Sequence, residues 1–215
     1  MTYHDLRAEH TAWVQRIHAV FFHQGAPALD DGALRAGRDL EAVRTAAACH
    51  LSPAGQLQAA TALCMLAGLE DRLDVLRHRL LAAARHLTGA KVVAERLYGV
   101  GPVTALALTC WLAGAGRFSS SRKAVRFTGL DITVWSSESK GPPGRLSRQG
   151  PPMLRWAVYE AGKTHARASA PDHGYYATVK DRKNSKRAAL SEARKIVRQA
   201  CHILTELGDD ALTAA

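Results

Sequence analysis

Hydrophobic residues recur at three- and four-residue steps along most of the chain, and this period predicts amphipathic helices. We expect helices over residues 6–22 and 32–48, and a long one from residue 53 to about 87 with Ser52 as its N-cap. Along the long segment, leucines stand at positions 63, 66, 69, 73, 76, 80 and 87. Such a stripe predicts a core or coiled-coil seam. Residues 1–90 are therefore expected to form a helical arm that packs or self-associates.

The pattern changes near residue 90, where residues 97–108 read LYGVGPVTALAL. Apolar segments on both sides of a glycine pair predict a helix-hairpin-helix, with Pro102 beginning the second helix. Gly99 and Gly101 can take conformations closed to other residues, and the free amides at that helix start can hold a phosphate. Gly99, Gly101 and Thr104 are thus candidate nucleic-acid-binding residues. The alternative is an ordinary glycine turn between two core helices.

Further helices are expected downstream, which makes the predicted fold class all-α. Ser119 to Ser121 should cap a short basic helix that ends at Gly129, and Pro151-Pro152 should open a helix to about residue 168. Trp156 and Tyr159 are the expected core anchors of that second helix. A last helix follows the basic run at 180–187. We predict a domain over residues 91–208 and a tail over 209–215.

Charge is distributed unevenly and changes the functional picture. The formal net charge is +10, and residues 117–200 hold 18 Lys and Arg against 6 Asp and Glu. Residues 1–116 hold 11 against 10. A concentrated basic excess indicates a polyanionic partner, above all a nucleic acid, whereas a merely solvated basic surface is the alternative. The short basic helix adds three candidate contacts to this surface: Arg122, Lys123 and Arg126.

The candidate chemistry lies in residues 134–155, VWSSESKGPPGRLSRQGPPMLR. Glycine and proline predict a shaped loop, and Ser136 and Ser137 are adjacent within it. A serine that attacks a phosphodiester needs surrounding positive charge, and Glu138 is the only acid in the segment. The candidate phosphate contacts are Lys140, Arg145, Arg148 and Arg155. A turn hydrogen bond is the alternative role for either serine.

Other classes of site have little support. The four cysteines, Cys49, Cys64, Cys110 and Cys201, show no metal-ligand spacing and no paired histidines, so we expect neither a metal site nor disulfides, only reduced core cysteines. The ten histidines are scattered and expected to be structural. No apolar run approaches the roughly 20 residues that cross a bilayer, and no signal peptide is evident. We therefore expect no membrane partner and a cytoplasmic location.

From about Tyr3 onward the chain resembles the insertion-sequence transposases of the IS one-ten family. The resemblance rests on residues 98–105, 117–131, 134–161 and 187–200. That family's C-terminal domain carries a reactive serine in a loop of the form aromatic-polar-Ser-Gly, which Trp135, Ser136 and Ser137 match. The resemblance implies that Ser137 is the catalytic nucleophile. Glu138 stands where many members have glycine, so Ser136 remains the alternative.

The family's other half is an RNase H-like domain with four acidic residues that bind Mg²⁺. We expect the chain to lack that domain and to bind no cofactor itself. The resemblance implies DNA as partner, a structured guide RNA as a further candidate, and a homo-oligomer or association with a full-length transposase. The expected function is serine attack on DNA during transposition. The alternatives are a non-catalytic nucleic-acid-binding remnant and a regulatory fragment that acts through the arm.

Overall fold

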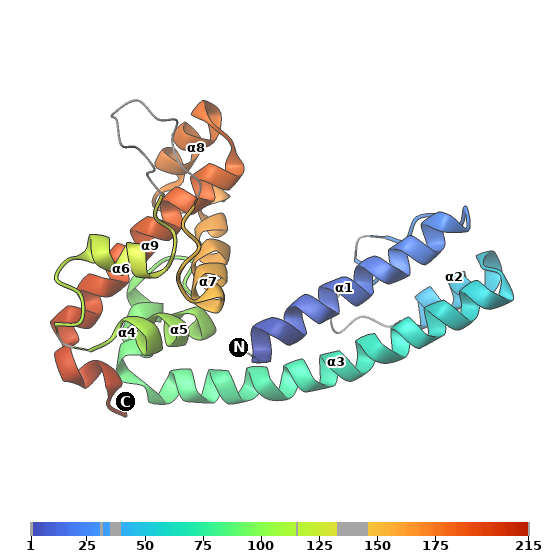
Figure 1. Ribbon diagram of the computed structural model, residues 1–215, viewed down its shortest axis with the longest axis horizontal. Helices are drawn as coiled ribbons and strands as arrows, with labels where there is room; N and C mark the ends of the chain where they lie inside the picture. The colour runs from blue at the N-terminus through green and yellow to red at the C-terminus, as the bar shows by residue number, and fades with distance from the viewer. Residues whose placement is uncertain (1, 31, 35–39, 115, 133–145, 215) are drawn as a thin grey trace. The chain divides into compact units, whose positions relative to one another are not determined.

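The computed structural model describes all residues except 1, 31, 35–39, 115, 133–145 and 215. Helices make up nearly all of its regular structure, as Figure 1 shows. Within the described residues the only β pairing is two isolated bridges, Leu87 with Ala214 and Ile132 with Leu146. The predicted all-α class is confirmed. No helix among the described residues combines the length and apolar character required to cross a membrane.

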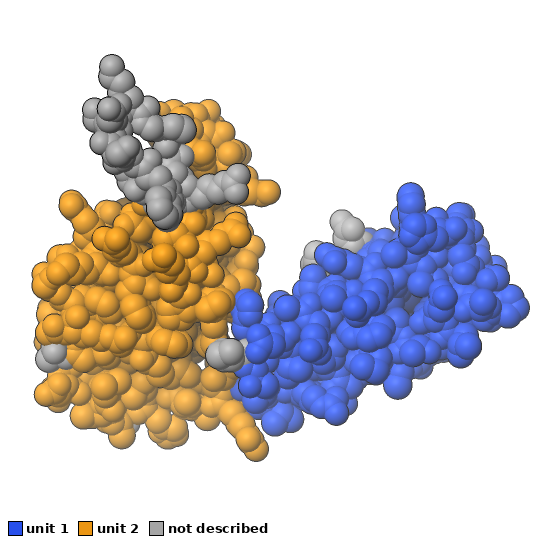
Figure 2. All heavy atoms as spheres, in the orientation of Figure 1, with its two compact units in different colours: residues 1–78 blue, residues 79–215 orange. Residues whose placement is uncertain are grey.

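The chain divides into two compact units, residues 1–78 and residues 79–215 (Figure 2). Unit 1 contains α1 (Thr2–His23), α2 (Glu41–His50) and most of α3 (Pro53–His86). Its core is apolar and includes Ile17 and Phe21 of α1, Val43 of α2 and Leu63 of α3. The first and third predicted helices are confirmed, and unit 1 has its own hydrophobic core.

Local signals explain where the helices of unit 1 begin. The Ser52 hydroxyl accepts a hydrogen bond from the Gly55 amide (3.2 Å), and Pro53 follows it, so α3 starts where the sequence indicated. The second helix begins at Glu41 instead of residue 32, because Asp30 accepts from the Gly32 amide (2.9 Å) and forms a turn there. The described part of the predicted 32–40 segment is not helical.

The leucine stripe on α3 changes character along its length. Leu63, Leu66, Leu69 and Leu73 are buried, whereas the later members of the stripe, Leu76, Leu80 and Leu87, are only partly buried. In the first half of α1, Nε2 of the buried His10 lies 3.2 Å from a carboxylate oxygen of Glu70 on α3. This polar contact joins the two helices. The stripe is therefore a core seam in its first half.

Unit 2 is organised around α9 (Ser185–Leu207), which packs against α4 (Thr88–Arg96), α5 (Pro102–Leu112), α6 (Ser121–Phe127), α7 (Pro152–Lys163) and α8 (His173–Arg182). In Figure 1, α7 and α9 run side by side. Small residues allow this approach: a Cβ on Gly162 would fall on the Ala189 carbonyl. A 3-10 helix, η1 (Thr164–Ala166), extends α7. A second, η2 (Gly208–Leu212), buries Ala211 in the core, so the described end of the chain packs onto unit 2.

Two sequence expectations were wrong, and one helix of unit 2 was not foreseen. The helix opened by Pro152 buries Leu154, Ala157 and Val158, whereas Trp156 and Tyr159 are only partly buried. α8 was not foreseen, because its sequence is polar and only Tyr176 on it is buried. Of the four cysteines in the chain, all free, only Cys201 is buried, so the expected core role fails for the other three.

Candidate nucleic-acid interface

The serine loop falls largely outside the described residues: Ser136, Ser137, Lys140 and Arg145 all lie in the 133–145 segment. The structure does describe both ends of that segment. Ile132 and Leu146 form an antiparallel bridge, and the Ser147 amide donates to the Asp131 carbonyl (2.9 Å). The Arg148 amide donates to the Gly129 carbonyl (3.1 Å). We call residues 129–132 and 146–150 the loop base, because these backbone bonds fix the two ends side by side.

Glycines make the loop base tight. Gly129 has φ +70°, in the left-handed region, and it ends α6 as the sequence indicated. A Cβ on Gly150 would fall on the Phe127 carbonyl oxygen and the backbone of Thr128. Arg148 is the one described non-glycine residue with positive φ (53°). The backbone of the two arms therefore meets without side chains between them.

Two arginines donate hydrogen bonds to backbone carbonyls of the loop base. Nη1 of Arg155, on α7, donates to the Arg148 carbonyl (3.2 Å) and to the Gly150 carbonyl (3.1 Å). Nε of Arg194, on α9, donates to the Leu130 carbonyl (2.8 Å). Burial lowers the pKa of both guanidinium groups, and the positive charge of Arg148 lowers that of Arg155 further, while Asp131 acts to raise that of Arg194. Both arginines remain charged at neutral pH.

Arg155 thus has a structural task besides the predicted phosphate contact, and Arg194 was not among the predicted site residues. No sequence motif reveals such a role, because the acceptors are backbone carbonyls, which every residue carries. Arg194 lies 64 positions from its partner Leu130. The arginines bring positive charge into contact with the loop base.

The short basic helix α6 directly precedes the loop base in the sequence. Ser120 caps this helix by accepting from the Lys123 amide, as the sequence indicated. Arg122, Lys123 and Arg126 are exposed, and none of them takes part in the ion pairs found among the described residues. Their charges are available to an anionic ligand.

The glycine pair forms the turn between α4 and α5. Gly99 has φ +76°, and a Cβ there would fall on Oγ1 of Thr164, so both conformation and packing require glycine. Gly101 differs from expectation: its φ of −75° is open to any residue, and nothing lies within 4 Å of a Cβ built on it. Pro102 begins α5 as predicted, and Thr104 is partly buried in the first turn.

An open pocket of about 640 Å³ lies against this turn. Its lining includes the turn residues 97–101 together with Arg96 and Arg167. Arg96 pairs with Glu206 at 3.4 Å, with both side chains largely exposed, and exposed pairs of this kind bind weakly. Glu95 also lines the pocket, so Arg167 and the exposed start of α5 are the features that favour an anion there.

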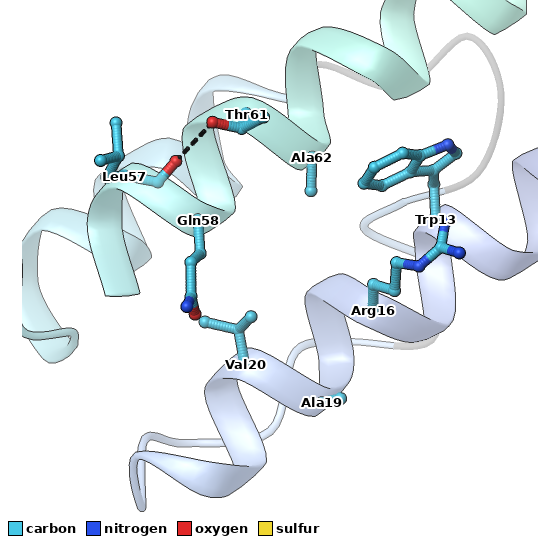
Figure 3. Close-up of a pocket in the computed structure, with 8 residues that line it drawn as sticks. All are labelled: Trp13, Arg16, Ala19, Val20, Leu57, Gln58, Thr61 and Ala62. Atoms are coloured by element: carbon cyan, nitrogen blue, oxygen red, sulfur yellow. Dashed lines mark hydrogen bonds between the residues drawn. The ribbon is translucent and has the colours of Figure 1, made fainter. Parts of the chain in front are cut away.

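Unit 1 offers a contrasting, apolar surface. An open pocket of about 530 Å³ lies between α1 and α3, and Figure 3 shows Trp13 and Val20 on its α1 side and Gln58 and Ala62 on its α3 side. Arg16 stacks its guanidinium 4.3 Å from the centre of the Trp13 ring. The side chain of Leu57 is 70% exposed, and that of Phe22, two positions after Val20 on α1, is 79% exposed. Apolar exposure of this size is typical of surfaces that meet another protein.

Together, the fold and the site define an all-α unit with a glycine turn between α4 and α5, a short basic helix and a loop base that holds the two ends of the serine-bearing segment together. Residues 92–177, which lie within unit 2, match the family model described as Transposase IS116/IS110/IS902 family. The match confirms the predicted resemblance over these residues, which run from within α4 to within α8 and include the serine loop in sequence. No curated protein matches the chain.

Proposed function

We propose that unit 2 binds the phosphate backbone of DNA and takes part in DNA transposition. The observation that carries the proposal is the loop base, whose backbone carbonyls accept hydrogen bonds from Arg155 and Arg194 within the stretch that matches the transposase family model. Exposed Arg122, Lys123 and Arg126 on α6 would extend this surface. Lys140, Arg145 and Arg148 are the further phosphate contacts that we propose.

The hairpin would add a second grip on the backbone. Residues 97–101, just before α5, line the open pocket together with Arg167. The free amides at a helix start favour phosphate without reading base sequence. Gly101 leaves room for a ligand to approach, since no atom lies near the position of a Cβ. We therefore expect Gly101→Val to weaken DNA binding while Gly174→Val, on the exposed start of α8, leaves it unchanged.

The proposed nucleophile is Ser137. Its hydroxyl oxygen would form a bond to phosphorus while one P–O ester bond breaks, and the hydroxyl proton would pass to the departing sugar oxygen. The product is a transient phosphoserine link to one DNA strand. Neighbouring guanidinium groups would stabilise the negative charge that builds on the phosphoryl oxygens. The Mg²⁺ that the resemblance implies belongs to the acidic domain of full-length relatives.

A denaturing gel with labelled element-end DNA and Mg²⁺ tests this chemistry directly. We expect a covalent adduct that Ser137→Ala abolishes and that Ser136→Ala, the matched control, leaves intact. Binding measured by fluorescence anisotropy should be unchanged in both variants. An adduct that persists in Ser137→Ala contradicts the assignment. Salt-sensitive binding without any adduct favours the alternative, a non-catalytic nucleic-acid-binding protein, with DNA and a structured RNA as the two ligands to compare.

Unit 1 favours a second role, association with another transposase chain. The apolar pocket between α1 and α3 and the exposed Leu57 support it. We expect a homo-oligomer or a complex with a full-length transposase, and Leu57→Asp should reduce the mass measured by analytical ultracentrifugation. Thr61→Asp, which introduces the same charge one turn further along α3, maps the extent of the surface. A cytoplasmic location accords with DNA as the ligand.

A further inference from the structure

Three side chains with metal-binding atoms converge in unit 2, away from the loop base. His165 lies in η1, Asp172 directly precedes α8, and Glu192 lies on α9. One ligand atom from each lies within 4.8 Å of the others, and Nδ1 of His165 is 3.6 Å from a carboxylate oxygen of Glu192. The packing of η1 and α8 against α9 brings them together, although the outer two are 27 positions apart along the chain.

Two members of this cluster are buried and lack partners. The side chain of His165 is 4% exposed and that of Glu192 is 0% exposed. Both ring nitrogens and both carboxylate oxygens lack a hydrogen-bond partner among the described residues, and 3.6 Å is too long for one between them. Buried polar groups left in this way cost free energy, so the fold is expected to supply something that satisfies them.

We propose that His165, Asp172 and Glu192 bind one divalent cation of the Zn²⁺ type. Imidazole nitrogen and carboxylate oxygen are both zinc ligands, at about 2.0–2.2 Å, and a tetrahedral site then places ligand atoms about 3.3 Å apart. The His165–Glu192 separation is already close to that value. A hard cation such as Mg²⁺ or Ca²⁺ prefers oxygen ligands alone, so the imidazole selects against it. Water would complete the fourth position.

The surroundings of the cluster are compatible with such a cation. The Tyr98 backbone approaches the His165 ring, although outside strict hydrogen-bond geometry, and a backbone group is a common partner for the second nitrogen of a metal-binding histidine. Burial lowers the pKa of His165, which keeps the imidazole neutral, the form that binds a metal. Burial raises the pKa of Glu192, whereas the charge of Lys195 acts to lower it.

Lys195 opposes the cation and gives the proposal a sharp test. Its Nζ lies 2.6 Å from an oxygen of Asp172, and it stands one turn after Glu192 on α9. A cation must therefore displace this ammonium group or use the other oxygen of Asp172. Removal of the lysine charge should strengthen cation binding. If the cluster were only an ion-pair network, the same change would not affect cation affinity.

The proposed role of the cation is structural. It would connect three parts of unit 2: η1, the residue that precedes α8, and α9. The cation would thereby hold α8 in place, a helix on which only Tyr176 is buried. α8 ends in the basic residues Lys180 and Arg182. The inference does not depend on the proposed serine chemistry, because it concerns other residues and a different ligand.

Metal titration of the full chain tests the site. After treatment with a chelator, the protein should take up one equivalent of Zn²⁺, measured by competition with a chromophoric chelator and by elemental analysis. Co²⁺ should give the visible absorption of a tetrahedral complex. A hundredfold excess of Zn²⁺ over its Kd should raise the thermal midpoint by about 5–10 °C. No stoichiometric uptake of either ion would overturn the proposal.

Variants identify the ligands. Glu192→Gln and His165→Asn should each weaken Zn²⁺ binding at least about tenfold, since even groups behind metal ligands contribute 10–100-fold. The matched controls Glu206→Gln and His202→Asn, both exposed in unit 2, should bind as the parent does. Lys195→Gln should bind more tightly. It alters a partly exposed residue, so it decides the matter even if the buried variants do not fold, and unchanged affinity in Lys195→Gln would overturn the proposal.

Discussion

Gly150 shows how a single hydrogen atom in place of a methyl group holds the loop base together. A Cβ at this position would fall on the Phe127 carbonyl oxygen, which belongs to the backbone and cannot move aside alone. We expect Gly150→Ala to lower the free energy of unfolding by about 1–3 kcal/mol, the usual cost of overpacking, as measured by urea denaturation. Gly174→Ala is the matched control, because nothing lies within 4 Å of the added methyl group there. Equal losses in both variants would contradict the close approach.

Variants of Arg155 and Arg122 distinguish an arginine that stabilises the fold from one that binds the ligand. Arg155→Met removes the donor to the Arg148 and Gly150 carbonyls, and we expect a loss of about 1–3 kcal/mol in the free energy of unfolding. Arg122→Met removes an exposed charge and should change stability by less than about 0.5 kcal/mol while weakening DNA binding. Urea denaturation and fluorescence anisotropy measure the two effects. The opposite order of stability losses would refute the bracing role of Arg155.

Helix α9 contacts most other helices of unit 2, so the stability of its first turn affects the stability of the whole unit. Asn184 caps it by accepting from the Arg187 amide at 2.9 Å. Asn184→Ala should cost about 1 kcal/mol, and Asn184→Asp should restore most of that loss, because the carboxylate accepts the same bond. Thermal denaturation followed by circular dichroism measures both. A loss in Asn184→Asp as large as in Asn184→Ala would show that the cap is unimportant.

Elements with clear local signals were predictable, and those held by distant contacts were not. Ser52, Ser120 and Pro102 act through their own neighbours in sequence, so the starts of α3, α6 and α5 follow from the chain itself. α8 is polar and is held by packing on α9, which no periodicity reveals. The late start of α2 reflects a turn at Asp30 that competes with helix formation.

Some residues of the candidate site could be predicted from the sequence, and others could not. The glycines and exposed cations of the interface could be listed from the sequence, because each is recognisable by residue type. The grip of Arg194 on the Leu130 carbonyl could not, since any carbonyl in the chain is an equivalent acceptor. Nor could the meeting of His165 with Glu192, because zinc motifs are recognised by short spacings, and these residues come from separate elements.

At the scale of the whole molecule, the uneven charge predicts how DNA binding responds to salt. Each phosphate contact contributes about 0.9 to the slope of log K against log salt concentration. Replacement of Arg122 and Lys123 together by Gln should therefore reduce the slope by about 2, as measured by fluorescence anisotropy between 50 and 200 mM salt. The matched control replaces the exposed Arg7 and Arg77 of unit 1 by Gln. An equal reduction in the control would place the DNA contacts outside the basic half.

The loop base has one more consequence, which concerns how such a protein can be altered. Its closing bonds at residues 129, 131, 147 and 148 are made by backbone atoms, and its bracing arginines also hold carbonyls. None of these bonds depends on the identity of the side chains between Ile132 and Leu146. We therefore expect the loop base to accept segments of different composition across the same two anchor points, so that reactivity could diversify on one scaffold.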